Sequence, residues 1–300
     1  MFKKFIVGKD YQDTRFDKWF KQNVINLPQS LIEKLIRKNK IKINNKRIKT
    51  SYRVKINDVV KIYGIESLKS QTKSKKDKYK PSKKEAAIYS DFVLEDNDNF
   101  IVINKPRGIP VQSGTKSFKN IIDILKNTKH FENSKPFIVH RLDKETSGVM
   151  IVAKNREYAQ LLTSLFRLRK VHKTYIAISY GSVSKKINIL KDNLVTYENN
   201  KKLVQKAISY LKVLKTNNNF SFLELKPITG RKHQLRKQLY NIGNPILGDD
   251  KYANKELNKN IKTKGLMLHA YKIKFMINNV KYNYEAKFNN DFSKFVKYNF

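Results

Sequence analysis

A short polar segment between two apolar runs carries the side chains that could do chemistry. Between His140 and Gly148 stand the cation Arg141, the carboxylates Asp143 and Glu145, and two hydroxyls. A carboxylate held beside a cation can act as a nucleophile or in proton transfer. Charges placed between buried segments cost free energy unless each is paired. The segment is therefore a structural network or a working site, and composition alone favours neither interpretation.

The apolar runs on both sides of this segment predict the strands that must hold it. Phe137–Val139 precedes it and Val149–Ala153 follows it, and both are rich in β-branched residues. Further strands are predicted over Phe100–Ile103, Lys173–Ile178 and Phe220–Leu225. Because strands and helices do not alternate strictly, we expect an α+β fold with a mixed, mostly antiparallel sheet flanked by helices.

Apolar residues at helical spacing predict the helices of the same region. They fall around Ile121–Leu125, over Tyr158–Leu168 with Asn155 as its cap, from Leu235 to Gly243, and from Asp291 onward. Thr229 and Gly230 predict a turn directly before the basic start of the helix near Leu235. Backbone amides of the turn and the side chain of Arg231 could bind an anion there.

Composition divides the chain into three parts. Residues 13–64 combine helical and strand patterns and predict a small N-terminal domain. Residues 65–86 carry many lysines and serines and few large apolar residues, so they cannot build a core and predict a flexible basic linker. Residues 87–300 predict a second, larger domain.

The N-terminal domain is predicted to begin with two helices. Thr14 with Asp17, and Ser30 with Glu33, have the spacing of capping boxes. Short basic strands joined by tight turns follow between residues 41 and 63.

The net charge is +39, from 64 lysines and arginines against 25 acidic residues. A field of this sign attracts polyanions, above all nucleic acid, and we favour RNA binding over the alternative of a codon bias that inflates lysine. The cations of the N-terminal domain concentrate around one helix and its hairpin, where an ordinary solvated surface is the alternative to an RNA-binding face. That face would use Arg15, Arg37, Lys38, Lys40, Lys46 and Arg47.

Several classes of protein are excluded by what the sequence lacks. Without cysteine there is no disulfide, thiolate nucleophile or cysteine-based zinc site, and the five histidines include no His-x-x-x-His pair. No phosphate-cradling glycine loop stands out, and no apolar stretch has the length of a signal peptide or a membrane span. We expect a cytoplasmic monomer without metal or nucleotide cofactor.

The order of the motifs resembles the signature of the pseudouridine synthases that modify structured RNA. Residues 13–64 resemble the small RNA-binding fold of ribosomal protein S-four. This combination is most similar to the bacterial enzymes that modify large-subunit (23S) ribosomal RNA, and among them to the type-C subfamily, which acts on several uridines. The matching motifs are His140–Asp143, Thr146–Gly148, Ala153-Lys154, Lys105–Gly108, Lys173–Tyr175, Thr229–Arg236, Asn244–Asp249 and Leu266–Ala270.

The resemblance implies a role for individual residues. Asp143 would be the catalytic nucleophile acting on a flipped-out uridine, although the residues leave open whether it attacks the base or the sugar. Arg231 would pair with this aspartate, and Tyr175 would pack against the target base and offer its hydroxyl for proton transfer. Arg141 would fill the space that the base leaves in the RNA. Glu145 is the competing acid, for which the family has no fixed role.

Other residues near these motifs have more ordinary interpretations. We expect His233 and His269 to be structural, while His140 either orders its loop or is structural as well. Without the surrounding match, Tyr175 would be a core tyrosine of a strand. Gln238 stands where the family usually has a histidine, and we expect a supporting position there.

Three other functions remain to be weighed against RNA modification. A kinase would need a glycine-rich loop and an Asp-Phe-Gly motif, which are missing. A glycosidase could use Asp143 with Glu145, but it would not explain the charge. The strongest alternative is a non-catalytic RNA-binding or ribosome-assembly factor, and the combined presence of Asp143, Tyr175 and Arg231 argues against it.

Overall fold

The computed structural model of the chain describes residues 2–49, 51–67, 79, 81–113, 119–198, 201–253 and 265–300. Two compact units separate, Met1–Lys78 and Tyr79–Phe300. Most of the predicted linker, residues 68–78 and 80, lies outside the described residues. Its last part was predicted wrongly, because helix α3 begins at Lys83 and runs to Ser90. Tyr89 of this helix packs against the core of the second unit, which gives the helix a partner that the lysine-rich composition hides.

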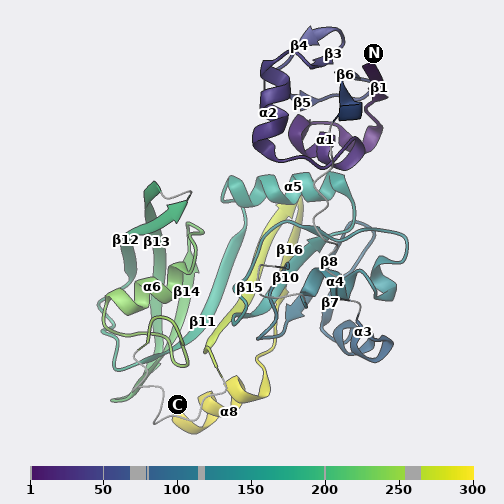
Figure 1. The fold of residues 1–300 in the computed structure, drawn as a ribbon. Coiled ribbons are helices and arrows are strands. Elements are labelled where there is room, and N and C mark those ends of the chain that lie inside the picture. Colours follow the sequence, from purple (N-terminus) through teal and green to yellow (C-terminus); the bar gives the residue numbers. More distant parts are fainter. Residues whose placement is uncertain are drawn as a thin grey trace. The chain divides into compact units, whose positions relative to one another are not determined.

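The first unit packs two helices against a small sheet (Figure 1). In its described part, four antiparallel strands follow the order β1-β6-β3-β4, and β2 pairs with β5. The core takes Phe16, Trp19 and Phe20 from α1 and the apolar side of α2. The elements are β1 (Phe2–Ile6), β2 (Thr14–Arg15), α1 (Phe16–Asn23), α2 (Gln29–Arg37), β3 (Ile41–Ile43), β4 (Lys46–Arg47), β5 (Arg53–Val54) and β6 (Val59–Tyr63).

The two predicted capping boxes of this unit are wrong. Thr14 lies in β2, paired with Val54, and α1 has Arg15 at its N-cap position. Helix α2 begins at Gln29 behind Pro28, so that Ser30 is already inside the helix. Neither N-cap residue makes a side-chain capping bond. The strand pairing and the fixed φ of proline set these helix starts in place of the local capping signals.

The second unit is built on one large sheet. In its described part, ten strands form this sheet, with the path β12-β13-β14-β11-β15-β10-β8-β7 and with β16 beside β15 and β9 beside β10. The strands are β7 (Val93–Asp96), β8 (Phe100–Lys105), β9 (Phe137–Ile138), β10 (Ser147–Ala153), β11 (His172–Tyr180), β12 (Ile189–Glu198), β13 (Lys201–Thr216), β14 (Phe220–Pro227), β15 (Leu268–Ile277) and β16 (Val280–Glu285).

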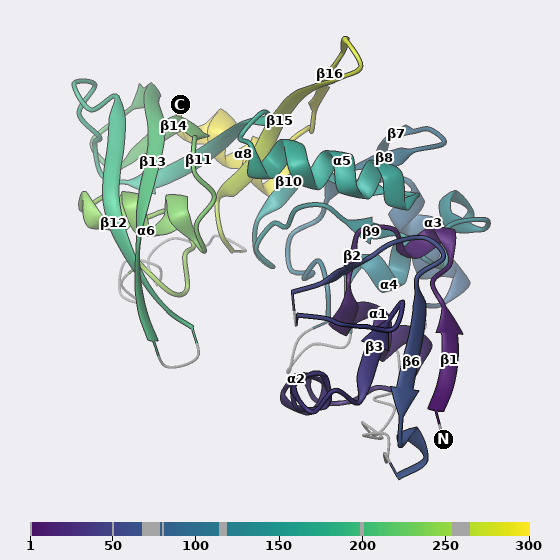
Figure 2. The ribbon, with the colours of Figure 1, turned by 90° about the horizontal axis from the view of Figure 1, so that it is seen from above.

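Four further helices accompany this sheet in the described residues. They are α4 (Ile121–Leu125), α5 (Arg156–Arg167), α6 (Gln234–Asn241) and α8 (Asn290–Asn299). Helix α5 lies along β9 and β10, and α6 lies against β12 at the other end of the sheet (Figures 1 and 2). No described helix is long and apolar enough to cross a membrane.

The predicted α+β fold with a mixed, mostly antiparallel sheet is confirmed. Of the described strand pairs, only β10 with β15 is parallel. The cap of α5 is also as predicted, because the Asn155 side chain accepts from the amide of Tyr158. The hairpins β12–β13 and β15–β16 were not predicted. Strands β13, β15 and β16 place lysines and other polar residues among their apolar residues, which weakens the apolar signal of a strand.

Candidate active site

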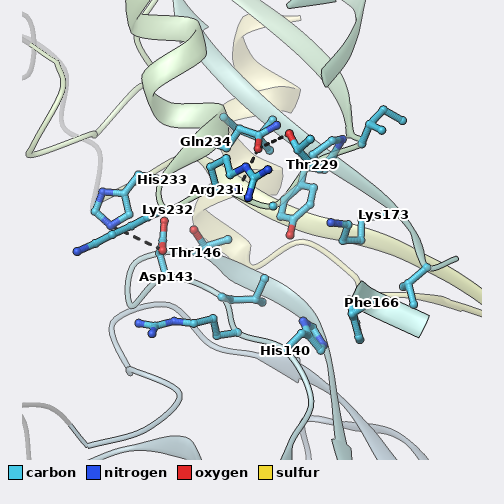
Figure 3. A pocket seen from close by; sticks show the side chains of 18 of the residues that line it. His140, Asp143, Thr146, Phe166, Lys173, Thr229, Arg231, Lys232, His233 and Gln234 are labelled. Carbon is cyan, nitrogen blue, oxygen red and sulfur yellow. Dashed lines mark hydrogen bonds and ion pairs between the residues drawn. The ribbon is translucent and has the colours of Figure 1, made fainter. Parts of the chain in front are cut away.

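A cavity of about 720 Å³ lies within the second unit. It brings together the polar segment after β9, the end of α5, the start of β11 and the turn between β14 and α6 (Figure 3). The cavity is lined by side chains from three separate parts of the sequence, which are Arg141 with Asp143, Tyr175, and Arg231. Glu145, the competing acid, is not among its lining residues.

The register of three strands brings the loop of Asp143 and the strand of Tyr175 together. In the parallel pair, Gly148 of β10 lies opposite Ala270 of β15, and on its other side Ala270 lies opposite Tyr175 of β11. Gly148 has φ of +111°, and a Cβ at this position would lie 2.2 Å from the carbonyl oxygen of Ala270. Only glycine allows this approach of the two backbones. The predicted loop-shaping role of Gly148 therefore has a physical basis at the start of the strand.

Contacts on both sides fix the loop that presents Asp143. The amide of Thr146 donates to the carbonyl of Asp143 at 3.2 Å, and Leu142 is buried in the core beneath the loop. His140 stacks on Phe166, with ring centroids 4.4 Å apart, and its Nε2 accepts from the amide of Ile151. Burial, with a smaller effect of nearby Lys173, lowers the pKa of His140 to about 3. This neutral histidine orders the loop, which was one of its two interpretations.

The side chains of His233 and Arg236 face the Asp143 carboxylate, and burial lowers the pKa of His233 below its ordinary value. His233 Nε2 lies 3.8 Å from Oδ1, and Arg236 Nη1 lies 3.9 Å from Oδ2. Figure 3 shows His233 directed at Asp143 from the turn that precedes α6. His233 has φ of +54°, a strained value for a residue with a side chain, and its Nδ1 is 2.9 Å from the Tyr252 hydroxyl. Its position at the carboxylate goes beyond the structural role predicted from the sequence.

Arg236 is held in place by a buried carboxylate. Its Nε and Nη2 donate to the two oxygens of Asp249 at 2.7 and 2.6 Å, which leaves Nη1 directed at Asp143. Although burial alone would raise it, the bonds from Arg236 keep the pKa of Asp249 below its ordinary value. The guanidinium also lies over the ring of Tyr252, 5.1 Å from its centroid. Bidentate pairing of this kind fixes direction as well as charge.

The predicted pairing of Arg231 with Asp143 is wrong. Among the ion pairs of the described residues none joins these two side chains, and Arg231 Nε donates to the carbonyl of Lys206 at 3.2 Å. The anion site of backbone amides is also not built as predicted, since the Arg231 amide donates to Gln234 Oε1. Gln234 further accepts from the Thr229 hydroxyl, and these bonds shape the turn so that Arg236 faces the aspartate. Arg231 remains at the cavity wall as a half-buried cation.

Tyr175 lies in the cavity beside Asp143. Burial raises the pKa of Tyr175 above its ordinary value, and the Asp143 carboxylate adds to this effect. Its hydroxyl is therefore protonated at neutral pH and available as a donor. Lys173, two residues earlier on the same strand, also lines the cavity, and burial lowers its pKa.

A buried lysine supports the same loop from below. Lys105, at the end of β8, is fully buried, and its Nζ donates to the carbonyls of Pro106 at 2.8 Å and Lys144 at 3.1 Å. Burial lowers the pKa of Lys105 to about 7, while Glu145 and Asp143 act in the opposite direction. This turn is among the motifs that resemble the family, and no task was predicted for its lysine. A lysine directly before proline at a strand end was the only signal.

Two further residues have the supporting roles expected of them. His269 Nδ1 bonds the Ser147 hydroxyl at 2.8 Å, and its Nε2 bonds the carbonyl of Ala286 at 3.0 Å. Gln238 is buried away from the cavity, where its amide bonds Ser209 and the carbonyl of Leu190. It joins α6 to the β12–β13 hairpin.

The residues predicted to bind RNA are all exposed. Arg141 lies at the wall of the cavity in the second unit. In the first unit, Arg15 pairs with Asp17 at 3.0 Å, and the Arg47 guanidinium reaches the carbonyl of Arg37 at 3.4 Å. Lys38, Lys40 and Lys46 are exposed near the C-terminal end of α2 and the following hairpin.

The comparisons with known proteins agree with this fold and site. Residues 99–241, which include Asp143, Tyr175 and Arg231, match the family described as RNA pseudouridylate synthase. Residues 14–60 match the S4 domain. The chain belongs to the RNA pseudouridine synthase family, whose members are isomerases, and it carries an N-terminal S4 domain.

Individual relatives and a solved structure are similar to most of the chain. The ribosomal large subunit pseudouridine synthase C of Rickettsia felis is 37% identical over 276 residues, which cover 87% of this chain and 88% of the relative. The protein of the same name from Buchnera aphidicola is 33% identical over 282 residues, which cover 90% and 88%. The structure of human RNA pseudouridylate synthase domain containing 4 is 27% identical, with a TM-score of 0.58, and covers 69% of this chain and 92% of that one.

Proposed function

We propose that the chain converts several uridines of large-subunit (23S) ribosomal RNA into pseudouridine, with Asp143 as the nucleophile. The observation that carries the proposal is the Asp143 carboxylate itself, which lines a cavity together with Tyr175 and has His233 and Arg236 beside it. The names of the curated relatives support the large ribosomal subunit as the source of the substrate. A cytoplasmic monomer acting on ribosomal RNA is part of the proposal.

The reaction is an isomerisation and needs no outside reagent. The bond between N1 of uracil and C1′ of the ribose breaks, the base turns, and a bond between C5 and C1′ forms. The proton on C5 is lost and N1 gains one, so atoms and electrons balance. Asp143 forms the covalent adduct that holds the nucleoside during this rearrangement.

The other residues that line the cavity have different roles in the reaction. Arg236, fixed by Asp249, positions the Asp143 carboxylate, and His233 lies beside its other oxygen. The Tyr175 ring offers a flat apolar surface to the uracil, and its protonated hydroxyl can donate to an oxygen or nitrogen of the turning base. Arg231, a half-buried cation of the wall, contacts the phosphate backbone.

The target uridine has to leave its stack before it can enter this cavity. Arg141, exposed two residues before Asp143, is placed to occupy the space that the base leaves in the RNA. The exposed cations of the S4 domain add affinity for a structured RNA. These cations are Arg15, Arg37, Lys38, Lys40, Lys46 and Arg47.

The proposal is tested by mapping pseudouridine in the large-subunit ribosomal RNA of cells that lack the gene. We expect specific sites to be lost, to return with the wild-type chain, and to stay unmodified with Asp143→Asn. Glu145→Gln is the matched control, since this acid lies outside the cavity lining, and it should restore the sites. A map that is the same with and without the gene would contradict the proposal.

A further inference from the structure

The sheet of the first unit has one buried face and one open face. Ile41, Ile43, Val60 and Ile62 point into the core and are at most 2% exposed. Because side chains alternate along a strand, the residues between them, Lys42 and Lys61, belong to the opposite face. Figure 2 shows β1, β6 and β3 side by side in this sheet.

A row of cations crosses the open face. The register pairs Lys4 of β1 with Lys61 of β6, Lys61 with Lys42 of β3, and Lys42 with Arg47 of β4. Residues directly opposite each other in antiparallel strands share a face, so these four side chains stand next to one another across four strands. At about 4.8 Å between strands, the row is about 14 Å long.

This row lacks acidic residues that would balance it within the sheet. The four strands contain no aspartate or glutamate, and no ion pair of the described residues involves Lys4, Lys61 or Lys42. Like charges directly opposite each other destabilise a sheet. A chance excess of lysine would scatter them over the surface and would not align them in register. An external polyanion resolves the repulsion.

Two aromatic rings border the row. Phe2 is 46% exposed and lies opposite Tyr63, with ring centroids 5.4 Å apart. Lys61 Nζ lies 4.9 Å from the centre of the Phe2 ring, and Lys42 Nζ lies 5.9 Å from that of Tyr63. An exposed ring and a half-buried ring beside a line of cations suit a single nucleic-acid strand, whose bases stack on the rings while its phosphates meet the charges.

We propose that this open face, formed by Phe2, Lys4, Lys42, Lys61 and Tyr63 with Arg47 at its edge, binds a single-stranded segment of RNA. Apart from Arg47, these residues differ from the RNA-binding residues proposed above for the S4 domain. Phe2 and Lys4 also precede residues 14–60, which match the S4 domain family. The proposal rests on RNA as the substrate, and it adds a second contact for an unpaired stretch of that RNA.

The test measures binding of a fluorescent single-stranded oligouridylate to the full chain over a series of salt concentrations. The protein carries Asp143→Asn in every case, so the outcome does not depend on catalysis. We expect Lys4→Gln with Lys61→Gln to weaken binding and to lower the slope of log K against log salt by about 1.4, as for two lost phosphate contacts. The matched control, Lys18→Gln with Lys55→Gln, removes two exposed lysines outside the four strands and should lower the slope by less.

A second measurement locates the RNA directly. With 4-thiouridine in the probe, we expect light-induced cross-links to the peptide that contains Phe2 and to the peptide that contains Tyr63. Phe2→Ala should remove the cross-link to the first peptide. Circular dichroism of each variant reports whether the sheet remains folded, and a folded variant pair that binds like its control would overturn the proposal. Cross-links confined to the second unit would overturn it as well. Failure of the proposed isomerase function would leave the binding and the cross-links unchanged.

Discussion

Arg236 and Asp249 form a buried bidentate pair that leaves one guanidinium nitrogen, Nη1, 3.9 Å from the Asp143 carboxylate. The sequence suggested Arg231 as the partner of this aspartate, and the structure gives that place to the arginine five residues later. The side chain that faces Asp143 is thus itself held by a second, fully buried carboxylate.

The first prediction concerns this arginine. Arg236→Lys keeps the charge but cannot bond both oxygens of Asp249 and still face Asp143. We expect kcat to fall by about 10² or more, with a small change of KM for RNA. Arg231→Ala, at the cavity wall, should mainly raise KM. Steady-state kinetics of both variants decide the matter, and a larger loss of kcat in Arg231→Ala would contradict the assignment.

The second prediction concerns the meeting of β10 and β15. Gly148→Ala would place a methyl group 2.2 Å from the carbonyl oxygen of Ala270, so the strands would have to separate. We expect the free energy of unfolding to drop by at least about 3 kcal/mol. Gly243→Ala is the matched control, because Gly243 also has positive φ, +81°, but open space around its Cβ position. It should cost about 1–2 kcal/mol. Equal losses in denaturant unfolding would show that the close contact is unimportant.

The third prediction concerns His140 and pH. Its pKa is about 3 in the folded chain and, for an exposed histidine, about 6.5 in the unfolded chain. Between these values only the unfolded chain binds the proton, so this contribution to stability is complete above pH 6.5 and is lost as pH falls toward 3.

His140→Gln removes this titration. Between pH 6 and 4, the unfolding free energy of the variant should fall less steeply than that of the wild type, by about 1.4 kcal/mol per pH unit. Unfolding curves in denaturant at several pH values provide the comparison. Two parallel pH profiles would mean that His140 is protonated in the folded chain.

The fourth prediction separates the ring of Tyr175 from its hydroxyl. Tyr175→Phe keeps the surface on which the uracil stacks and removes the donor. We expect RNA binding to be retained and kcat to fall by about 10² to 10⁴. Tyr175→Leu should weaken binding of the substrate as well. Single-turnover rates beside equilibrium binding make the distinction, and a fully active Tyr175→Phe would leave the tyrosine with a packing role alone.

The features that could be predicted from the sequence depend on neighbouring residues or on the order of the motifs along the chain. Asn155 as a helix cap, Gly243 as a helix end and the strand over residues 149–153 are set by neighbouring residues, and they were confirmed. The family and the fold followed from motifs that recur in the right order. Asp143 and Tyr175 were each found this way, and the structure brings them to one cavity.

What could not be predicted depends on contacts between distant residues. Arg231 and Arg236 are equally good cations in sequence, and the bonds of Gln234 and Asp249 decide which of them faces Asp143. His233 acquires its position from a left-handed backbone conformation that no local signal announced. The capping boxes failed for a similar reason, because the partner strand of Thr14 lies 40 residues away, at Val54.

The most direct test of the central claim uses purified protein and large-subunit ribosomal RNA transcribed without modifications. Pseudouridine formed per mole of enzyme is measured for the wild type, Asp143→Asn and Glu145→Gln, each shown by circular dichroism to be folded. We predict that the wild type and Glu145→Gln form pseudouridine at the same sites, and that Asp143→Asn binds the RNA but forms none. Pseudouridine formed by Asp143→Asn at the wild-type rate would contradict the account.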